Sequence, residues 1–83
     1  MITVYTTGHA CVQCRATLRY LDDHGIHVTV VDLTDPVNAP AHAYVTDDLG
    51  YTQAPVVVVD DYDHWSGFQP DKLTAQAHHR EAS

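Results

Sequence analysis

The chain has 83 residues, of which 45% are hydrophobic, so it suits one small domain with a single core and is too apolar for a disordered segment. Its formal net charge of −7 argues against nucleic acids and anionic membranes as partners, because both attract positive patches. No apolar run approaches the roughly 20 residues that a membrane-spanning helix needs. We therefore expect one monomeric domain over residues 1–83 that binds neither nucleic acid nor membrane.

The first part of the chain predicts a strand, a helix and a second strand. The alternation of β-branched and aromatic residues over Ile2–Thr6 is typical of a strand. A helix is expected over Val12–Asp23, with Gly25 suited to its end, because apolar positions recur with helical spacing. The residues on that face are Cys14, Thr17, Leu18 and Leu21. Residues 26–33 should form a second strand, parallel to the first after a right-handed crossover.

The second part predicts a helix, two more strands and a last helix. The second helix should begin within residues 36–40 and end at Gly50. Its buried stripe would contain Ala41, Tyr44, Val45 and Leu49. Residues 55–59, a proline and four valines, suit a strand covered on both faces, and residues 64–65 should return antiparallel to it. A third helix should follow Phe68, with residues 78–83 as a frayed tail.

The predicted order of elements is β-α-β-α-β-β-α. This order indicates an α/β fold in which a four-stranded mixed sheet is flanked by three helices, with helices on both faces.

The two cysteines, Cys11 and Cys14, lie where the first strand gives way to the first helix. Two thiols at this spacing beside a β-α-β pattern are typical of a dithiol redox centre. The first turn of a helix offers free backbone N–H groups and a positive dipole end, which favour an ionised thiolate at Cys11. Cys14 lies about one turn away on the same face, so it could attack a mixed disulfide formed at Cys11.

The spacing leaves other roles open, including a structural disulfide, half of a zinc site, or two unrelated thiols. Cys11, Cys14 and His9 could supply three ligands to a metal ion or an iron–sulfur cluster. A zinc site usually takes four well-spaced ligands, however, and the other histidines are scattered along the chain. We therefore expect no metal. An interaction module with an incidental disulfide is the remaining alternative.

The location of the protein follows from the same cysteines. A redox spacing fits a reducing compartment better than a secreted scaffold held together by disulfides. Residues 1–5 lack the basic and cleavable apolar segments of a signal peptide. We therefore expect the protein in the cytoplasm.

Three stretches together resemble the NrdH-type redoxins, small glutaredoxin-like members of the thioredoxin/glutaredoxin superfamily. The first is the strand over Ile2–Thr6 with the Cys-Val-Gln-Cys motif and the Ala-Thr pair that follows it. The second is Gln-Ala-Pro-Val-Val-Val at residues 53–58. The third is His-Trp-Ser-Gly-Phe at residues 64–68, with Pro70 and Asp71. The resemblance covers about residues 2–73 and implies a thioredoxin-like fold.

The resemblance also implies roles for these residues. Cys11 would be the attacking thiolate and Cys14 the resolving thiol, and the two would form a redox-active disulfide. Pro55 would follow a cis peptide bond, and the backbone of Ala54 would pair with an incoming extended peptide. Without the resemblance, Pro55 would be expected as an ordinary trans proline at the start of a strand. Further contacts with substrate or partner are implied at Val12, Gln13, Trp65, Ser66, Gly67 and Phe68.

Trp65 and Phe68 have an alternative role in the core, because aromatic side chains bury readily in a small domain. From the residues alone, we expect Phe68 to pack in the core, whereas Trp65 could serve either the core or a functional surface.

Two departures from the family pattern affect the site. Family members usually carry a lysine and a proline in the loop before the first cysteine, where this chain has Thr-Gly-His-Ala at residues 7–10. They also usually carry an arginine at the position of Gln69, which can donate hydrogen bonds but brings no charge. The helix terminus must therefore contribute more of the stabilisation of the thiolate.

The function that the resemblance implies is a dithiol–disulfide oxidoreductase that donates electrons to the large subunit of class Ib ribonucleotide reductase. NADPH would supply these electrons through the flavoprotein thioredoxin reductase, and no bound cofactor is expected. The alternative is a glutaredoxin reduced by glutathione, or a general protein disulfide reductase. Glutathione is anionic and needs basic groups, whereas residues 36–71 contain no lysine or arginine, so we favour thioredoxin reductase.

Overall fold

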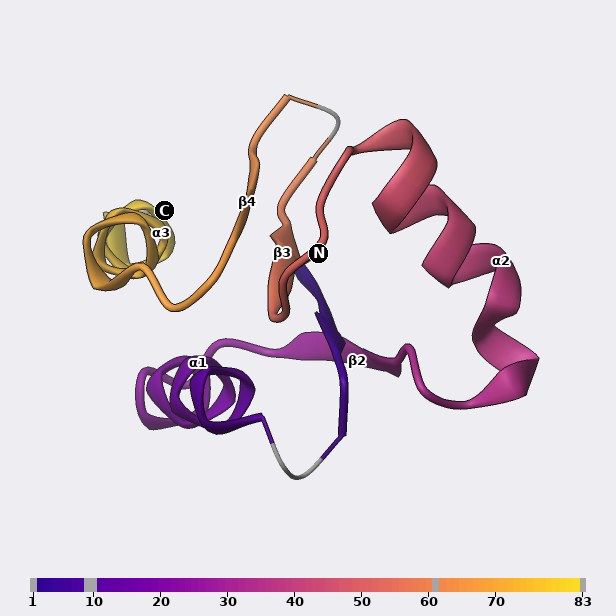
Figure 1. The fold of residues 1–83 in the computed structure, drawn as a ribbon. Helices are drawn as coiled ribbons and strands as arrows, with labels where there is room; N and C mark the ends of the chain where they lie inside the picture. Colours follow the sequence, from indigo (N-terminus) through magenta and orange to yellow (C-terminus); the bar gives the residue numbers. More distant parts are fainter. Residues whose placement is uncertain (1, 9–10, 61, 83) are drawn as a thin grey trace.

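The computed structural model describes residues 2–8, 11–60 and 62–82. The strands are β1 (Ile2–Thr6), β2 (Val28–Asp32), β3 (Val56–Val58) and β4 (His64–Ser66). The helices are α1 (Val12–Asp23), α2 (Ala39–Ala43) and α3 (Pro70–Ala82). The predicted order of elements is confirmed. Figure 1 shows α1 and α3 on one face of the sheet and α2 on the other.

The four strands form one mixed sheet in the order β2-β1-β3-β4. β1 pairs with β2 in parallel, with Thr6 opposite Asp32 at the end of both strands. β3 pairs antiparallel with β1 and with β4, and the antiparallel pairing with β4 confirms the prediction. Tyr5, near the end of β1, lies opposite Val56 at the start of β3. The register therefore brings the ends of β1 and β2 and the start of β3 to one edge of the sheet.

The hydrophobic core lies on the face of the sheet that α1 and α3 cover. Ile2 and Val4 are buried because alternate residues of a strand point to the same face. The core cluster consists of Ile2, Val4, Leu21, Ile26, Val57, Trp65 and Leu73. α1 contributes the predicted face, in which Cys14, Thr17 and Leu21 are buried and Leu18 is half-buried. This packing fixes the helix that carries the two cysteines.

α1 ends where the sequence predicts. Gly25 adopts a φ of +68°, in the left-handed region that glycine enters at little cost, and its N–H donates to the Asp22 carbonyl at 2.9 Å.

The second helical segment is less regular than the single helix predicted from the sequence. A 3₁₀ turn at Pro36–Asn38 precedes α2, and a π-type turn follows it at Tyr44–Asp48. The Thr46 hydroxyl donates to the His42 carbonyl at 2.9 Å, and such side-chain bonds compete with the regular ladder of a helix. Of the predicted stripe, Val45 is buried, while Ala41, Tyr44 and Leu49 are only half-buried.

The third helix is longer than predicted. α3 begins at Pro70, shortly after Phe68, and its backbone is helical to Ala82. The fraying of residues 78–83 stays a prediction. Alanine, arginine and glutamate in this stretch all favour helix, and neither glycine nor proline interrupts it. In the part of the chain that the structure describes, none of the helices combines the length and apolar character needed to cross a membrane.

Candidate active site

The two cysteines form a disulfide at the start of α1, with their Cα atoms 5.2 Å apart. Cys11 is the N-cap of the helix, with an extended backbone, and its sulfur accepts a hydrogen bond from the Cys14 N–H at 3.2 Å. The Cys11 carbonyl accepts from the Arg15 N–H at 3.1 Å, which begins the helical ladder. The Cys14 N–H, in the first turn of the helix, is therefore directed at the Cys11 sulfur, where it would stabilise negative charge after reduction together with the helix dipole.

The two sulfurs differ in their access to solvent. Cys14 is 1% exposed, whereas Cys11 is half-buried. Val12, between them, is 75% exposed. A disulfide on a large partner can therefore reach Cys11 but not Cys14.

Pro55 lies at the same edge of the sheet, directly before β3. The Ala54–Pro55 peptide bond is cis, which confirms the prediction from the family resemblance. Pro55 is buried and Ala54 is half-buried. The pairing of β3 with β1 begins at the next residue, Val56.

The turn after β4 is hydrogen-bonded both to the Pro55 segment and to the start of α1. The Gly67 N–H donates to the Pro55 carbonyl at 2.8 Å, and the Phe68 N–H donates to the Gln13 side-chain carbonyl at 3.1 Å. Gly67 has a φ of +80°, and a Cβ atom placed on it would lie 3.3 Å from the Gln13 Oε1 atom. Gln13 thus fastens this turn to the active-site helix. Sequence reasoning placed Gln13 at the partner surface and missed this internal contact, which spans 55 residues.

Of the two places that the sequence left open for Trp65, the structure shows the core and not the partner surface that the resemblance implied. Trp65 lies opposite Val57 in the sheet, shares the face covered by α1 and α3, and is only 3% exposed. The Lys72 Nζ atom lies 5.7 Å from the centre of its ring, a cation–π distance. The buried indole N–H has no hydrogen-bond partner among the described residues.

Phe68 was expected from the residues alone in the core, but it lies at the surface. It is 36% exposed rather than packed in the core, because it follows β4 in the turn held by Gln13. Ser66 is half-buried at the end of β4. The Gln69 side chain donates to the Ser66 carbonyl at 2.8 Å, so it supports the turn by hydrogen bonding without a charge.

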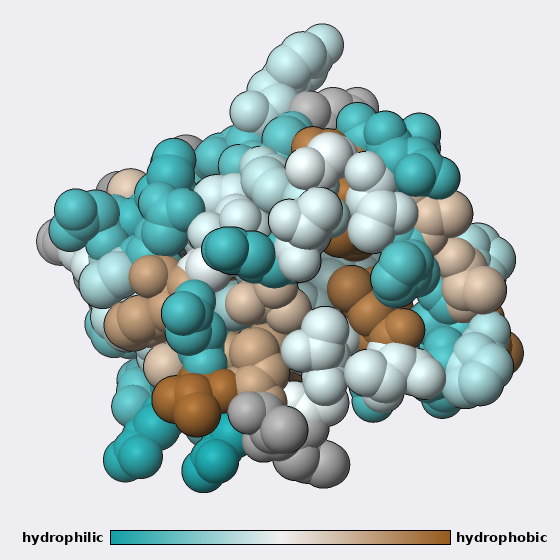
Figure 2. Space-filling view, in the orientation of Figure 1, coloured by the Kyte–Doolittle hydropathy of each residue, from teal (hydrophilic) through white to brown (hydrophobic). Residues whose placement is uncertain are grey.

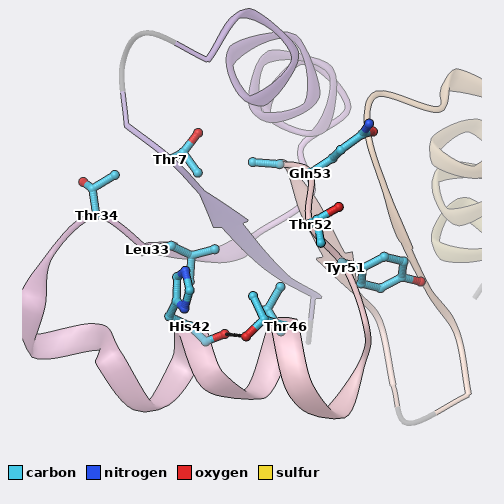
Figure 3. A pocket seen from close by; sticks show the side chains of 10 residues that line it. Thr7, Leu33, Thr34, His42, Thr46, Tyr51, Thr52 and Gln53 are labelled. Carbon is cyan, nitrogen blue, oxygen red and sulfur yellow. Dashed lines mark hydrogen bonds between the residues drawn. The ribbon is translucent and has the colours of Figure 1, made fainter.

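A hollow of about 170 Å³ lies beside Ala54, between the sheet and the segment containing α2. Figure 3 shows threonine side chains around it, with His42 reaching from α2 toward Leu33. Of the residues that line it, all of them described, none is lysine or arginine. The lining residues are Thr7, Leu33, Thr34, His42, Val45, Thr46, Tyr51, Thr52, Gln53 and Ala54.

A second hollow, of about 180 Å³, lies on the other face of the sheet beside Cys14. α1 contributes Cys14, Arg15 and Leu18 to its lining. The sheet side and the loop contribute Thr6, Gly8, Val30 and Asp32. The sequence analysis did not consider Asp32, although its place at the end of a strand parallel to β1 was a usable signal.

One ionisable group near this edge has a shifted pKa. Burial raises the pKa of Tyr5 above its ordinary value of 10.0, and the nearby Tyr44 phenol adds to this effect. The two rings lie 6.3 Å apart. Tyr5 is therefore a neutral phenol at physiological pH.

The metal alternative depended on His9, which lies outside the residues that the structure describes. Elsewhere in the described chain, no three His, Cys, Asp or Glu side chains gather in a way that could hold an ion.

The surface shows no large apolar area on the face in view. Figure 2 shows hydrophobic residues in small separate patches among hydrophilic ones.

Comparison with known proteins gives matches over most of the chain. The family model described as glutaredoxin matches residues 2–64. The Gene 56 protein of Mycobacterium phage D29 is 43% identical over 72 residues, which cover 87% of this chain and 77% of that protein. The glutaredoxin-like protein NrdH of Escherichia coli K12 is 36% identical over 72 residues, covering 87% of this chain and 83% of that protein.

The solved structure of NrdH-redoxin from Escherichia coli has the same fold, with a TM-score of 0.74 and 35% sequence identity. The match covers 89% of this chain and 91% of that chain. The Escherichia coli protein is described as glutaredoxin-like with a thioredoxin-like activity profile.

Proposed function

The chain belongs to the glutaredoxin family as an NrdH-type redoxin, and from this premise we propose that it donates electrons to class Ib ribonucleotide reductase. It is a thiol–disulfide oxidoreductase whose reacting groups are the paired cysteines at the start of α1. The observation that carries the proposal is the unequal access to the two sulfurs: Cys11 is reachable from outside, and Cys14 is 1% exposed.

The reaction begins at Cys11 in the reduced chain. The Cys11 thiolate attacks one sulfur of the partner disulfide, that bond breaks, and the other partner sulfur leaves as a thiolate that takes up a proton. Cys14, as a thiolate, then attacks the Cys11 sulfur and releases the second partner thiol. Two electrons pass to the partner, and the chain is left with the Cys11–Cys14 disulfide present in the structure.

The edge of the sheet supports binding of an extended peptide. Ala54 lies two residues before Val56, the first paired residue of β3, so a peptide could add to its backbone in the manner of a further strand. The hollow beside Ala54 has room for a side chain of that peptide (Figure 3). Phe68 and Val12, both exposed, flank the site as apolar contacts.

Thioredoxin reductase is the reductase that we propose, with NADPH as the electron source and no cofactor bound to this chain. Glutathione carries net negative charge, and neither lysine nor arginine lines the hollow beside Ala54, all of whose residues the structure describes. The thioredoxin-like activity profile described for the Escherichia coli relative points the same way. NADPH-dependent reduction also places the proposed activity in the cytoplasm, where the chain would act as a monomer.

The test is NADPH oxidation coupled to ribonucleotide reduction, with either thioredoxin reductase or glutathione and glutathione reductase as the electron source. We expect turnover with thioredoxin reductase. Faster turnover with the glutathione system would overturn the choice of reductase.

Capture of the partner tests the roles of the two thiols. Cys14→Ser should accumulate a mixed disulfide with the large subunit, because the resolving thiol is missing. The matched variant Cys11→Ser should form none. A mixed disulfide through Cys14 would reverse the assigned roles, and no adduct from either variant would reject ribonucleotide reductase as the partner.

A further inference from the structure

We propose that Asp32 is the proton acceptor for Cys14 when the mixed disulfide is resolved, acting through water in the hollow that both side chains line. The role rests on the proposed function, because it concerns the second step of that exchange. It assigns a task to a carboxylate that belongs neither to the cysteine motif nor to the partner surface.

Cys14 needs a proton acceptor because it must be a thiolate to attack, and its surroundings disfavour that form. It is 1% exposed, and burial favours the neutral thiol over the charged thiolate. The helix terminus does not compensate in the same way as for Cys11, since the Cys14 N–H is directed at the Cys11 sulfur, 3.2 Å away. Direct transfer of the Cys14 proton to bulk solvent is therefore hindered.

Asp32 lies on the face of the sheet that α1 and Cys14 cover. Asp32 ends β2 and lies directly opposite Thr6, the last residue of β1. Both residues line the hollow that Cys14 lines from α1. The Asp32 Oδ1 atom accepts hydrogen bonds from the Thr34 N–H at 2.8 Å and from the Thr34 hydroxyl at 2.6 Å, which hold the carboxylate in place.

The hollow is large enough to hold the water through which the proton would pass from Cys14 to Asp32. Its volume of about 180 Å³ exceeds what one water molecule occupies, and general bases commonly act through one water. Among the described residues that line it, the charged groups are Asp32 from β2 and Arg15 from α1. Arg15 is exposed and would favour negative charge on either the thiolate or the carboxylate. Leu18 and Val30 supply the apolar part of its lining.

In the mixed disulfide, the Cys11 sulfur is bonded to a partner sulfur, and Cys14 carries a proton. That proton passes through water to the Asp32 carboxylate, and the Cys14 thiolate attacks the Cys11 sulfur. The Cys11–partner bond breaks as the Cys11–Cys14 bond forms, and the partner thiolate leaves with the electron pair. The proton on Asp32 returns to solvent.

The experiment separates the two steps with a dithiobis(nitrobenzoate) probe, mixed with an excess of the reduced full chain in a stopped-flow spectrometer. The first coloured thiolate is released when Cys11 attacks, and the second when Cys14 resolves the adduct. In Asp32→Asn, we expect the second release to slow by about 100-fold at neutral pH, the lower end of the effect of a positioned base. The first release should change less than twofold.

The pH profile distinguishes proton transfer from a structural effect. In the natural chain, the second release should reach its plateau at lower pH than in Asp32→Asn. The rate of the variant should continue to rise with pH until Cys14 ionises without help. A loss of rate that is the same at every pH would overturn the role of Asp32.

Two further variants complete the test. Asp35→Asn removes the same charge three residues away, from a side chain that caps the next turn, and should leave both releases unchanged. Asp32→Glu keeps the carboxylate and should recover most of the second rate. If Asp32→Asn behaves like Asp35→Asn, or if Asp32→Glu is as slow as Asp32→Asn, the proposal is wrong. A natural chain that shows no first release would instead reject Cys11 as the nucleophile.

Discussion

The two faces of the sheet differ in how much of the core they carry. The face under α1 and α3 holds the whole core cluster, including Leu21, Trp65 and Leu73. On the face under α2, Val45 is the one buried residue of the irregular segment 36–48, and a hollow remains beside Ala54. The face under α1 and α3 carries the core that fixes the cysteine helix in position, whereas the segment on the other face buries fewer side chains. Substitutions of the same kind should therefore have different effects on the two faces.

The largest difference is expected for leucine deletions. Leu73→Ala, on α3, should lower the free energy of unfolding by about 2–5 kcal/mol, because Leu73 is fully buried and its removal leaves a cavity. Leu49→Ala, after α2, should cost about 1 kcal/mol, since that side chain is only half-buried. Urea unfolding of the oxidised chain measures both. Equal losses would mean that the two faces are packed alike.

The regularity of the two faces also explains what could be predicted from the sequence. α1 was predicted to the residue because its apolar spacing and Gly25 indicate the same helix. The segment around α2 was not, because it changes from a 3₁₀ turn to α-helix to a π-type turn, and Thr46 bonds to a backbone carbonyl within it. A single local hydrogen bond of this kind leaves no periodic signal.

In the active site too, some features could be predicted from the sequence and others could not. The cysteine pair and the cis bond at Pro55 could be predicted, since each belongs to a short motif. The burial of Trp65 and the exposure of Phe68 could not, because the pairing of β4 turns Trp65 to the core while Phe68 lies in the turn beyond that strand. The contact of Gln13 with Phe68 and the hollow shared with Asp32 depend on segments far apart in the sequence.

Gly67 and Gly50 have similar backbone angles but different surroundings. Gly67 and Gly50 have φ values of +80° and +77°, so alanine at either position should cost about 1–2 kcal/mol from the left-handed conformation alone. A Cβ atom at Gly67 would also crowd Gln13, whereas the space around Gly50 is open within 4 Å. Gly67→Ala should therefore be more destabilising, by about 1 kcal/mol.

The double variant Gln13→Ala with Gly67→Ala isolates that contact. Removal of the Gln13 side chain should relieve the crowding, so the two changes should cost less together than the sum of their separate losses. Urea unfolding of the natural chain, the two single variants and the double variant measures the four free energies of unfolding that this comparison needs. Strict additivity would show that Gln13 does not hold the turn after β4.

The hollow on the α2 face can be filled without disturbing the core. His42→Trp should raise the KM for a protein disulfide about fivefold if a peptide side chain enters this hollow (Figure 3), with kcat nearly unchanged. The rate with the small dithiobis(nitrobenzoate) probe should not change, since that probe needs only Cys11. His27→Trp, at an exposed position before β2, is the matched control. An unchanged KM for His42→Trp would remove the hollow from the peptide site.

The smallest effect concerns Tyr5, whose ring lies near Tyr44 of the segment that follows α2. Burial, with a contribution from Tyr44, raises the pKa of Tyr5 above 10.0, so the folded chain favours the neutral phenol more than the unfolded chain does. The stability that this provides is fully present below about pH 10 and is lost as the pH rises through the folded pKa. Tyr5→Phe cannot ionise and should lose less stability in alkaline urea than the natural chain. Tyr62→Phe removes a hydroxyl that is 97% exposed and should keep the natural pH dependence. The same alkaline loss in Tyr5→Phe as in the natural chain would mean that ionisation of Tyr5 is not coupled to packing on the α2 face.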